Sequence, residues 1–223
     1  MGHRGARHEA PENTLAGIEL ALQAGAEAIE IDVRRAAGGE VVVIHDARVD
    51  RTTSGSGLVS ELSLAELRGL DAGEGERIPT LAEVLELCRG RAELFVELKE
   101  GGCEAAVVQH ARDAGVGEDC LVKSFDHRWV AAAKAAGPEL RVGCLLYGRP
   151  VDPVGLVRAA GADFISISVD YAEAEFVALC HAGEVAVCAW NCNDPQALAG
   201  YRAAGVDWLG TDAPTRLLAS PPD

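Results

Sequence analysis

The feature that most constrains the fold is a regular alternation of short β-type runs with longer Ala- and Leu-rich segments of helical spacing. Most helical segments end at a glycine, such as Gly25, Gly115 or Gly205, and the next apolar run follows within a few residues. This order predicts repeated βα units, whose strands lie parallel in one sheet. The predicted strands are the segment ending at His3, Ala28–Val33, Val41–His45, Glu93–Leu98, Cys120–Ser124, Arg141–Leu146, Asp163–Ser168, Glu184–Ala189 and Val206–Gly210. The predicted helices are Thr14–Ala24, Leu81–Cys88, Glu104–Ala114, Arg128–Ala136, Val154–Ala160, Ala172–His181, Gln196–Ala204 and Ala213–Ala219.

The number of strands indicates the architecture. Val33 and Val41 are separated by a short link that contains Gly38-Gly39. A parallel crossover needs a dozen or more residues, so these two strands are expected to form a hairpin. Without the return strand, eight strands remain, which is the number in a (β/α)₈ barrel. The alternative, a doubly wound open sheet, favours a Gly-rich phosphate-binding fingerprint after the first strand, and residues 3–7 do not match it.

One segment departs from the βα repeat. Residues 46–79 are polar and Gly-rich, with a weak helical stretch at Leu64–Leu70 that Ser63 is expected to cap. A length of 223 residues suits one large α/β domain. We therefore expect an irregular (β/α)₈ TIM barrel over residues 1–223, with a small inserted subdomain at about residues 46–79 over the barrel mouth.

The charge balance indicates the kind of substrate. Twenty basic and thirty-five acidic residues give a formal net charge of −15. Nucleic acids and anionic membranes bind positive surfaces, so we expect neither nucleic-acid binding nor stable membrane association. A dissolved small molecule fits better, and an anionic one requires local positive charge at the site. The alternative is that the acidity serves only solubility. The residues do not indicate an oligomeric state.

Cysteine usage indicates the compartment. The seven cysteines are an odd number and lack metal-type C-x-x-C spacing. Several of them lie in apolar runs, where a free thiol behaves as a small hydrophobic group. No targeting segment and no apolar run of membrane-spanning length is recognised. These observations predict a cytoplasmic protein.

Carboxylates concentrate at two predicted strand ends, where barrel active sites lie. Glu30 and Asp32 are two positions apart, so their side chains share one face, and Glu97 and Lys99 repeat this spacing on the next barrel strand. Each pair alone is more consistent with a salt bridge, to Arg34 or to Lys99. Three carboxylates at one mouth repel one another unless a cation neutralises them. Together they predict one divalent ion, Mg²⁺ or Ca²⁺, held by Glu30, Asp32 and Glu97.

Two histidines end neighbouring predicted strands. His3 ends the first strand, and His45 ends the return strand of the hairpin, which carries it back towards the carboxylates. Histidine titrates near neutral pH, so a pair suits a reaction in which one proton is removed and another delivered. Arg4 and Lys99 would supply fixed positive charge to a phosphoryl group. The other four histidines are interpreted as structural or surface residues, namely His8, His110, His127 and His181.

These residues resemble the glycerophosphodiester phosphodiesterase family. The motifs occur in order between residues 3 and 214, and the first two pairings are specific only in combination. They are His3-Arg4-Gly5 with Pro11-Glu12-Asn13-Thr14, Glu30-x-Asp32 with His45-Asp46, Glu97-x-Lys99, Trp190-x-x-Asn193, and Thr211-Asp212-x-Pro214. Only Met1-Gly2 precede His3, where the family usually has several apolar residues. Either a very short first strand or a native start upstream of Met1 is therefore expected.

The resemblance implies an irregular (β/α)₈ barrel with an insertion between the E-x-D and E-x-K strands. It implies a divalent metal on Glu30, Asp32 and Glu97, acid–base catalysis by His3 and His45, and phosphate contacts from Arg4 and Lys99. The expected products are sn-glycerol 3-phosphate and an alcohol such as choline or ethanolamine. In the family's proposed mechanism a glycerol hydroxyl attacks the phosphorus and forms a cyclic intermediate.

Trp190 is expected to form an apolar wall near the glycerol or the alcohol. Two alternatives remain: a lysophospholipase D-like phosphodiesterase, which needs an apolar approach for an acyl chain, and a non-catalytic phosphodiester-binding barrel. The second alternative predicts that a histidine or carboxylate of the set is missing, and all are present.

Overall fold

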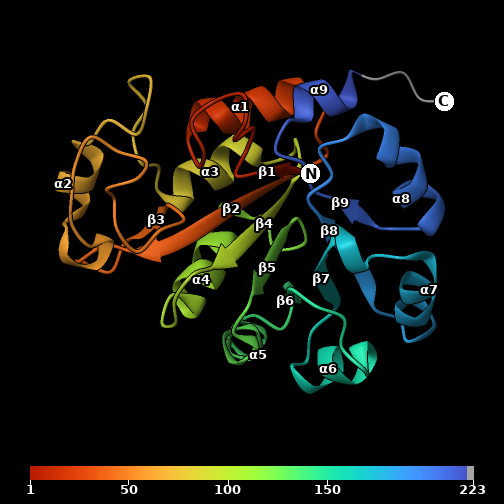
Figure 1. Cartoon of the computed structure of the whole chain (residues 1–223). Coiled ribbons are helices and arrows are strands. Elements are labelled where there is room, and N and C mark those ends of the chain that lie inside the picture. The colour runs from red at the N-terminus through yellow and green to blue at the C-terminus, as the bar shows by residue number, and fades with distance from the viewer. Residues whose placement is uncertain (220–223) are drawn as a thin grey trace.

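The structure is a computed structural model that describes residues 1–219. Its strands form one curled sheet with the order β1-β2-β4-β5-β6-β7-β8-β9, and all neighbours along this path are parallel (Figure 1). The strands are β1 (Gly2–His3), β2 (Ala28–Arg35), β3 (Val41–Val43), β4 (Glu93–Leu98), β5 (Cys120–Ser124), β6 (Arg141–Leu146), β7 (Phe164–Ser168), β8 (Ala186–Trp190) and β9 (Trp208–Leu209).

The two edges of this sheet meet. Gly2 in β1 bridges Thr211, which follows β9. The His3 amide donates to the Thr211 carbonyl at 2.9 Å, and the Thr211 amide donates to the Met1 carbonyl at 3.0 Å. These bonds pair the first strand with the end of the last, as barrel closure requires. The predicted irregular (β/α)₈ barrel is confirmed.

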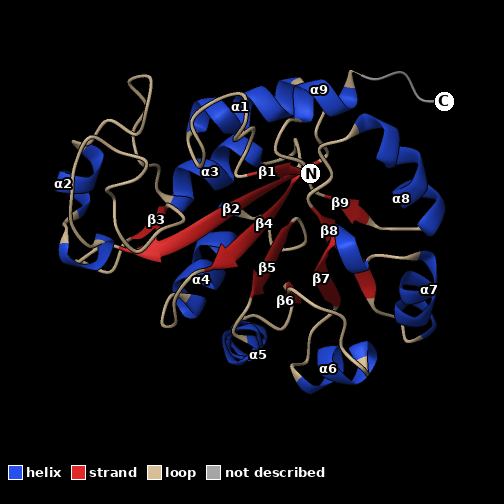
Figure 2. Cartoon of the chain, viewed as in Figure 1, coloured by secondary structure: helices blue, strands red, loops and turns tan. Residues whose placement is uncertain are grey.

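Helices surround the sheet on its outer side (Figure 2). They are α1 (Leu15–Gln23), α2 (Leu64–Arg68), α3 (Leu81–Cys88), α4 (Glu104–Ala114), α5 (His127–Ala136), α6 (Pro153–Ala159), α7 (Ala174–Ala182), α8 (Leu198–Ala204) and α9 (Pro214–Leu218), with short 3-10 turns at η1 (Val59–Glu61), η2 (Val169–Tyr171) and η3 (Pro195–Ala197). Thr14 caps α1, and Ser63 and Thr80 form capping boxes with Glu66 and Glu83. Local sequence therefore sets where these helices begin.

The hairpin that returns the chain towards the site is confirmed. β3 pairs antiparallel with β2, with Val33 opposite Val43. The strand is shorter than expected, because pairing ends at Val43 and the chain then turns into the insertion. The Ile44 amide still donates to the Asp32 carbonyl at 2.9 Å. His45 therefore begins its loop directly beside the carboxylate strand.

Two late strands also differ from their predicted ranges. Glu184 has φ of 60°, a turn conformation, so β8 begins at Ala186 and extends to Trp190. The Val206 amide donates to the Tyr201 carbonyl and belongs to the turn that ends α8, so β9 begins only at Trp208. The later end of β8 makes Trp190 a strand residue at the barrel mouth.

The core has three parts. The main cluster lies between the sheet and the helices, and a smaller one, around Phe95, Phe164 and Leu121, fills the barrel interior. A third cluster, built around Val49 and Leu67, lies under the segment between β3 and α3. The assignment of residues 46–79 as a separate inserted subdomain stays a prediction.

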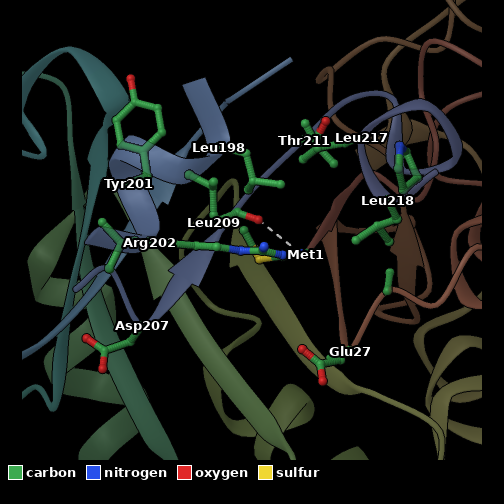
Figure 3. Close-up of a pocket in the computed structure, with 13 residues that line it drawn as sticks. Met1, Glu27, Leu198, Tyr201, Arg202, Asp207, Leu209, Thr211, Leu217 and Leu218 are labelled. Atoms are coloured by element: carbon green, nitrogen blue, oxygen red, sulfur yellow. Dashed lines mark hydrogen bonds between the residues drawn. The ribbon is translucent and has the colours of Figure 1, made fainter. Parts of the chain in front are cut away.

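A cavity of about 200 Å³ lies at the seam of the barrel, between α8 and α9 (Figure 3). Leu198 and Tyr201 border it on one side and Leu217 on another, and the Met1 amino group donates to the Leu209 carbonyl beside it at 2.9 Å. None of the predicted site residues lines this cavity. Within residues 1–219, no helix is both long and apolar enough to cross a bilayer.

Candidate active site

The strand register brings the three predicted carboxylates together. Asp32 lies opposite Glu97 on the neighbouring strand, and Glu30 lies opposite His3. The three side chains are buried, and one ligand atom from each lies within 4.8 Å of the others. Glu97 lies near the carboxyl end of β4, and its register with Asp32 places the cluster towards the end of the barrel where such folds position a site.

Burial and nearby charges shift the pKa values of this cluster in opposite directions. Burial and the charge of Asp32 raise the pKa of Glu97. Burial also acts to raise the pKa of Glu30, but the combined charges of Lys123, whose ammonium lies 3.2 Å away, His3 and Arg4 prevail and lower it. The ammonium of Lys99 lies 2.5 Å from Glu97 and 3.6 Å from Asp32. Glu30 Oε1 faces the Lys123 ammonium at 3.2 Å and Asp32 Oδ1 faces the Lys99 ammonium at 3.6 Å, but neither oxygen accepts a well-formed hydrogen bond from residues 1–219. Buried carboxylate oxygens that accept no hydrogen bond can serve as ligands of a hard divalent cation.

His3 is held by a polar network from the last two strands. Its Nδ1 lies 2.6 Å from Asp212 Oδ1, and its Nε2 lies 3.8 Å from Glu30. Asn193 donates to Asp212 Oδ2 at 2.7 Å, and Asn191 Nδ2 lies 2.8 Å from His3 Nδ1. Burial opposes ionisation of Asp212, but its bonds to His3 and Asn193 prevail and lower its pKa to about 2. The ring is thus fixed from its Nδ1 side.

His45 has a carboxylate partner of its own. Its Nδ1 lies 2.6 Å from Asp46, and Arg51 bonds both oxygens of Asp46 at 2.6 and 3.2 Å. Arg51 also bonds both oxygens of Glu12, and Glu12 accepts a bond from Arg4 at 2.9 Å. Burial lowers the pKa of His45, against the charge of Asp32 and the bond to Asp46, which raise it. One chain of ion pairs therefore connects His45 with Arg4.

Arg4 and Asn13 reach the carboxylates through unusual backbone conformations. Their φ angles are 51° and 58°. The Arg4 amide donates to Glu30 at 3.1 Å, and its Nε lies 3.1 Å from Asp32. Asn13 donates to Asp32 at 2.9 Å and accepts from the Asp32 amide at 3.2 Å. The segment before α1 thus supports both carboxylates of β2.

Trp190 ends β8, at the barrel mouth. Its ring centroid is 6.3 Å from that of Phe125 and 6.3 Å from that of Tyr147, and Tyr147 is 5.6 Å from Tyr171. Trp190 therefore belongs to a group of contacting rings, and its role as an apolar wall beside the substrate stays a prediction.

Several residues of the site were not assigned a part in its chemistry from sequence, although Asn13 or Thr14 was expected to cap the first helix. Asp212, Asp46 and Asn13 occur in the family motifs, but their side-chain partners depend on the fold. Lys123 ends a predicted strand, and its register opposite Glu97 turns it into the barrel. Arg51 lies in the insertion, where no signal marked it. Among the other histidines, His8 lies near the site, with Nε2 3.7 Å from Asp212.

The fold and this geometry define a (β/α)₈-barrel enzyme class with a carboxylate centre flanked by two histidines. The sequence model of the glycerophosphoryl diester phosphodiesterase family matches residues 3–216, and the chain belongs to this family. It is 33% identical to the glycerophosphodiester phosphodiesterase of Caldanaerobacter subterraneus subsp. tengcongensis. The alignment covers 98% of this chain and 95% of that protein.

Solved structures of glycerophosphodiester phosphodiesterases have the same fold as this chain. The crystal structure of a glycerophosphodiester phosphodiesterase from Agrobacterium tumefaciens superimposes with a TM-score of 0.89 at 30% identity, covering 98% of each chain. A phosphodiesterase from Oleispira antarctica, solved in complex with the product sn-glycerol-3-phosphate, gives a TM-score of 0.87 at 30% identity, covering 97% of this chain and 93% of its own.

Proposed function

We propose that the protein hydrolyses glycerophosphodiesters, such as glycerophosphocholine or glycerophosphoethanolamine, to sn-glycerol 3-phosphate and an alcohol, and that it needs a divalent metal ion. The observation that carries this proposal is the cluster of three buried carboxylates between two histidines, each histidine within 2.6 Å of its own carboxylate partner. The product-bound structure of the Oleispira antarctica relative supports the substrate class.

Glu30, Asp32 and Glu97 would hold the metal, Mg²⁺ or Ca²⁺. The buried oxygens of Glu30 and Asp32 that accept no well-formed hydrogen bond, and the raised pKa of Glu97, support these three residues as ligands. When bound, such an ion supplies positive charge to the phosphoryl oxygens. Arg4 and Lys99 border the same carboxylates and would contact the phosphate.

His3 and His45 would transfer the protons. One imidazole accepts the proton of the attacking hydroxyl, and the other donates a proton to the alcohol oxygen as its bond to phosphorus breaks. Asp212 and Asp46 hold the Nδ1 atoms, which leaves Nε2 of each ring for this exchange. Histidines oriented by carboxylates through Nδ1 are a recurring arrangement in acid–base catalysis.

The test is incubation with glycerophosphocholine at neutral pH, with Mg²⁺ or Ca²⁺ and with EDTA, followed by assay of sn-glycerol 3-phosphate. We expect product with metal and none with EDTA. The variant His45→Ala should lose turnover and still bind metal, which separates proton transfer from metal binding. Absence of product with every divalent metal supplied would overturn the proposal.

A further inference from the structure

The barrel mouth is divided into a polar half and an aromatic half. The polar half is formed by β1, β2 and β4, which carry the histidine, the carboxylates and Lys99. On the other half, four consecutive strands are each followed by, or end in, an aromatic residue. These are Phe125 after β5, Tyr147 after β6, Tyr171 in the turn after β7, and Trp190 at the end of β8.

This arrangement takes a large share of the aromatic side chains. The chain has ten (three Trp, three Tyr and four Phe), so four of the ten lie on this rim. Their contacts run from Phe125 to Trp190, from Trp190 to Tyr147 and from Tyr147 to Tyr171, at 5.6–6.3 Å between centroids. The rings therefore form one continuous wall, which we call the aromatic rim.

The aromatic rim is open to solvent and borders the reaction centre. Phe125 is 52% exposed and Tyr147 is 64% exposed, although large apolar rings are usually buried. Trp190 directly precedes Asn191, whose side chain contacts His3. At the other end, Phe125 and Lys99 line the same cavity, of about 520 Å³. A phosphodiester held at the polar half can thus extend one of its two arms onto the rings.

The charges at the Tyr147 end of the aromatic rim favour a cationic arm. The Tyr147 hydroxyl donates to Asp170 at 3.2 Å, and no Lys or Arg among residues 1–219 pairs with that carboxylate. Arg149 pairs with both Glu173 and Glu175, so this group of three side chains carries one net negative charge. A phenol that donates to a carboxylate has a more electron-rich ring, and electron-rich ring faces attract cations.

We propose that the aromatic rim is a subsite for a quaternary ammonium group, so that the leaving alcohol is of the choline type. This inference rests on the proposed function. A trimethylammonium group has no N–H donor, so it needs ring faces and diffuse negative charge rather than hydrogen-bond acceptors. An acyl chain, by contrast, would place its methylenes beside the carboxylate of Asp170, which is the less favourable contact.

The test compares two substrates that differ only in the alcohol, glycerophosphocholine and glycerophosphoglycerol. In Tyr147→Leu and Phe125→Leu, kcat/KM for glycerophosphocholine should fall about five- to tenfold more than for glycerophosphoglycerol. Tyr147→Phe keeps the ring and should retain most of the preference. Tyr201→Leu is the matched control, because this tyrosine lines the seam cavity instead. The control should leave the ratio of the two substrates unchanged.

A second measurement does not need turnover. Tetramethylammonium chloride is titrated into the wild type and Tyr147→Leu, with tryptophan fluorescence and calorimetry as readouts, and the wild type should bind more tightly. An unchanged substrate ratio in both Leu variants overturns the aromatic subsite while the proposed function stands. If the Leu variants lose activity only on a lysophospholipid, the rim binds an acyl chain, and the proposed quaternary ammonium subsite is overturned as well. If neither substrate is hydrolysed, the proposed function fails, and the titration alone decides whether the rim binds the cation.

Discussion

His3 Nδ1 lies 2.6 Å from Asp212 Oδ1, and this contact joins two residues that are 209 positions apart in the chain. It spans the seam where β1 meets the end of β9. A carboxylate on Nδ1 fixes the tautomer and the ring plane, so that Nε2 is directed towards Glu30, 3.8 Å away. The first strand is only two residues long, and His3 is held in addition by Asp212, which follows the last strand of the sheet.

The first prediction concerns this pair. Asp212→Asn keeps the size of the side chain but removes the charge that stabilises a protonated His3. We expect kcat to fall by about 10²-fold or more, with a smaller change in KM, because proton transfer is impaired while metal and phosphate contacts remain. Steady-state kinetics on glycerophosphocholine would measure both constants.

The chain supplies a matched control for this variant. His181 and Asp207 form another His–Asp pair, at 2.9 Å, on the outer surface. Asp207→Asn should leave kcat within about twofold of the wild type, since surface substitutions have small effects. Equal activities for Asp212→Asn and the wild type would remove Asp212 from any part in orienting His3.

The second prediction concerns the metal. Glu97→Gln removes one ligand charge and should weaken Mg²⁺ or Ca²⁺ binding in a calorimetric titration. Saturating metal stabilises a folded protein that binds it, so the wild type should gain about 5–10 °C in Tm at a hundredfold excess over Kd. Glu97→Gln should gain much less. Glu104→Gln, the same change at the start of α4 and outside the carboxylate cluster, is the control. An identical metal response in all three proteins would count against Glu97 as a ligand.

The third prediction is a pH effect. Burial lowers the pKa of His45, and the bond to Asp46 partly offsets this by raising it. Asp46→Asn removes a raising contribution, so the pKa of His45 should fall further, and the limb of the kcat/KM profile that reports His45 should move to lower pH. If the acidic limb moves, His45 acts as the base; if the alkaline limb moves, it acts as the acid. A profile in which neither limb moves would argue against His45 as a titrating group.

Much of the fold followed from local signals. Helical spacing, capping residues and glycine ends were enough to place the βα units. The short link between Val33 and Val41 predicted the hairpin, and strand parity predicted that Glu30 and Asp32 share a face. Their register beside Glu97 confirms that the three carboxylates meet.

The remaining parts of the site depend on tertiary structure. The contact of Asp212 with His3 exists only because the barrel closes, and no local pattern encodes closure. Lys123 could not be predicted as a buried partner of Glu30, since the inward direction of its side chain depends on strand register. Phe125 and Tyr147 follow their strands in loops, where periodicity carries no information about direction.

The last prediction concerns Arg51, which lies in the insertion and bonds both Asp46, the partner of His45, and Glu12, the partner of Arg4. Its guanidinium bonds Asp46 and Glu12 with two contacts each, and these two carboxylates hold His45 and Arg4. The bonds from Arg51 and Arg4 outweigh burial and lower the pKa of Glu12 to about 2, so Glu12 stays ionised across the working pH range. A lysine cannot form this planar four-contact arrangement.

We therefore expect Arg51→Ala to lower kcat about 10- to 100-fold, the range seen when groups that orient site residues are removed. Arg51→Lys should recover only part of the loss, whereas added guanidinium should partly rescue Arg51→Ala and not Arg51→Lys. Arg48→Ala is the matched control, because Arg48 lies in the same segment and pairs only with exposed Asp50 among residues 1–219. Kinetics of the three variants at equal metal saturation would decide the point, and an Arg51→Ala enzyme as active as Arg48→Ala would show that the insertion does not position the two sides of the site.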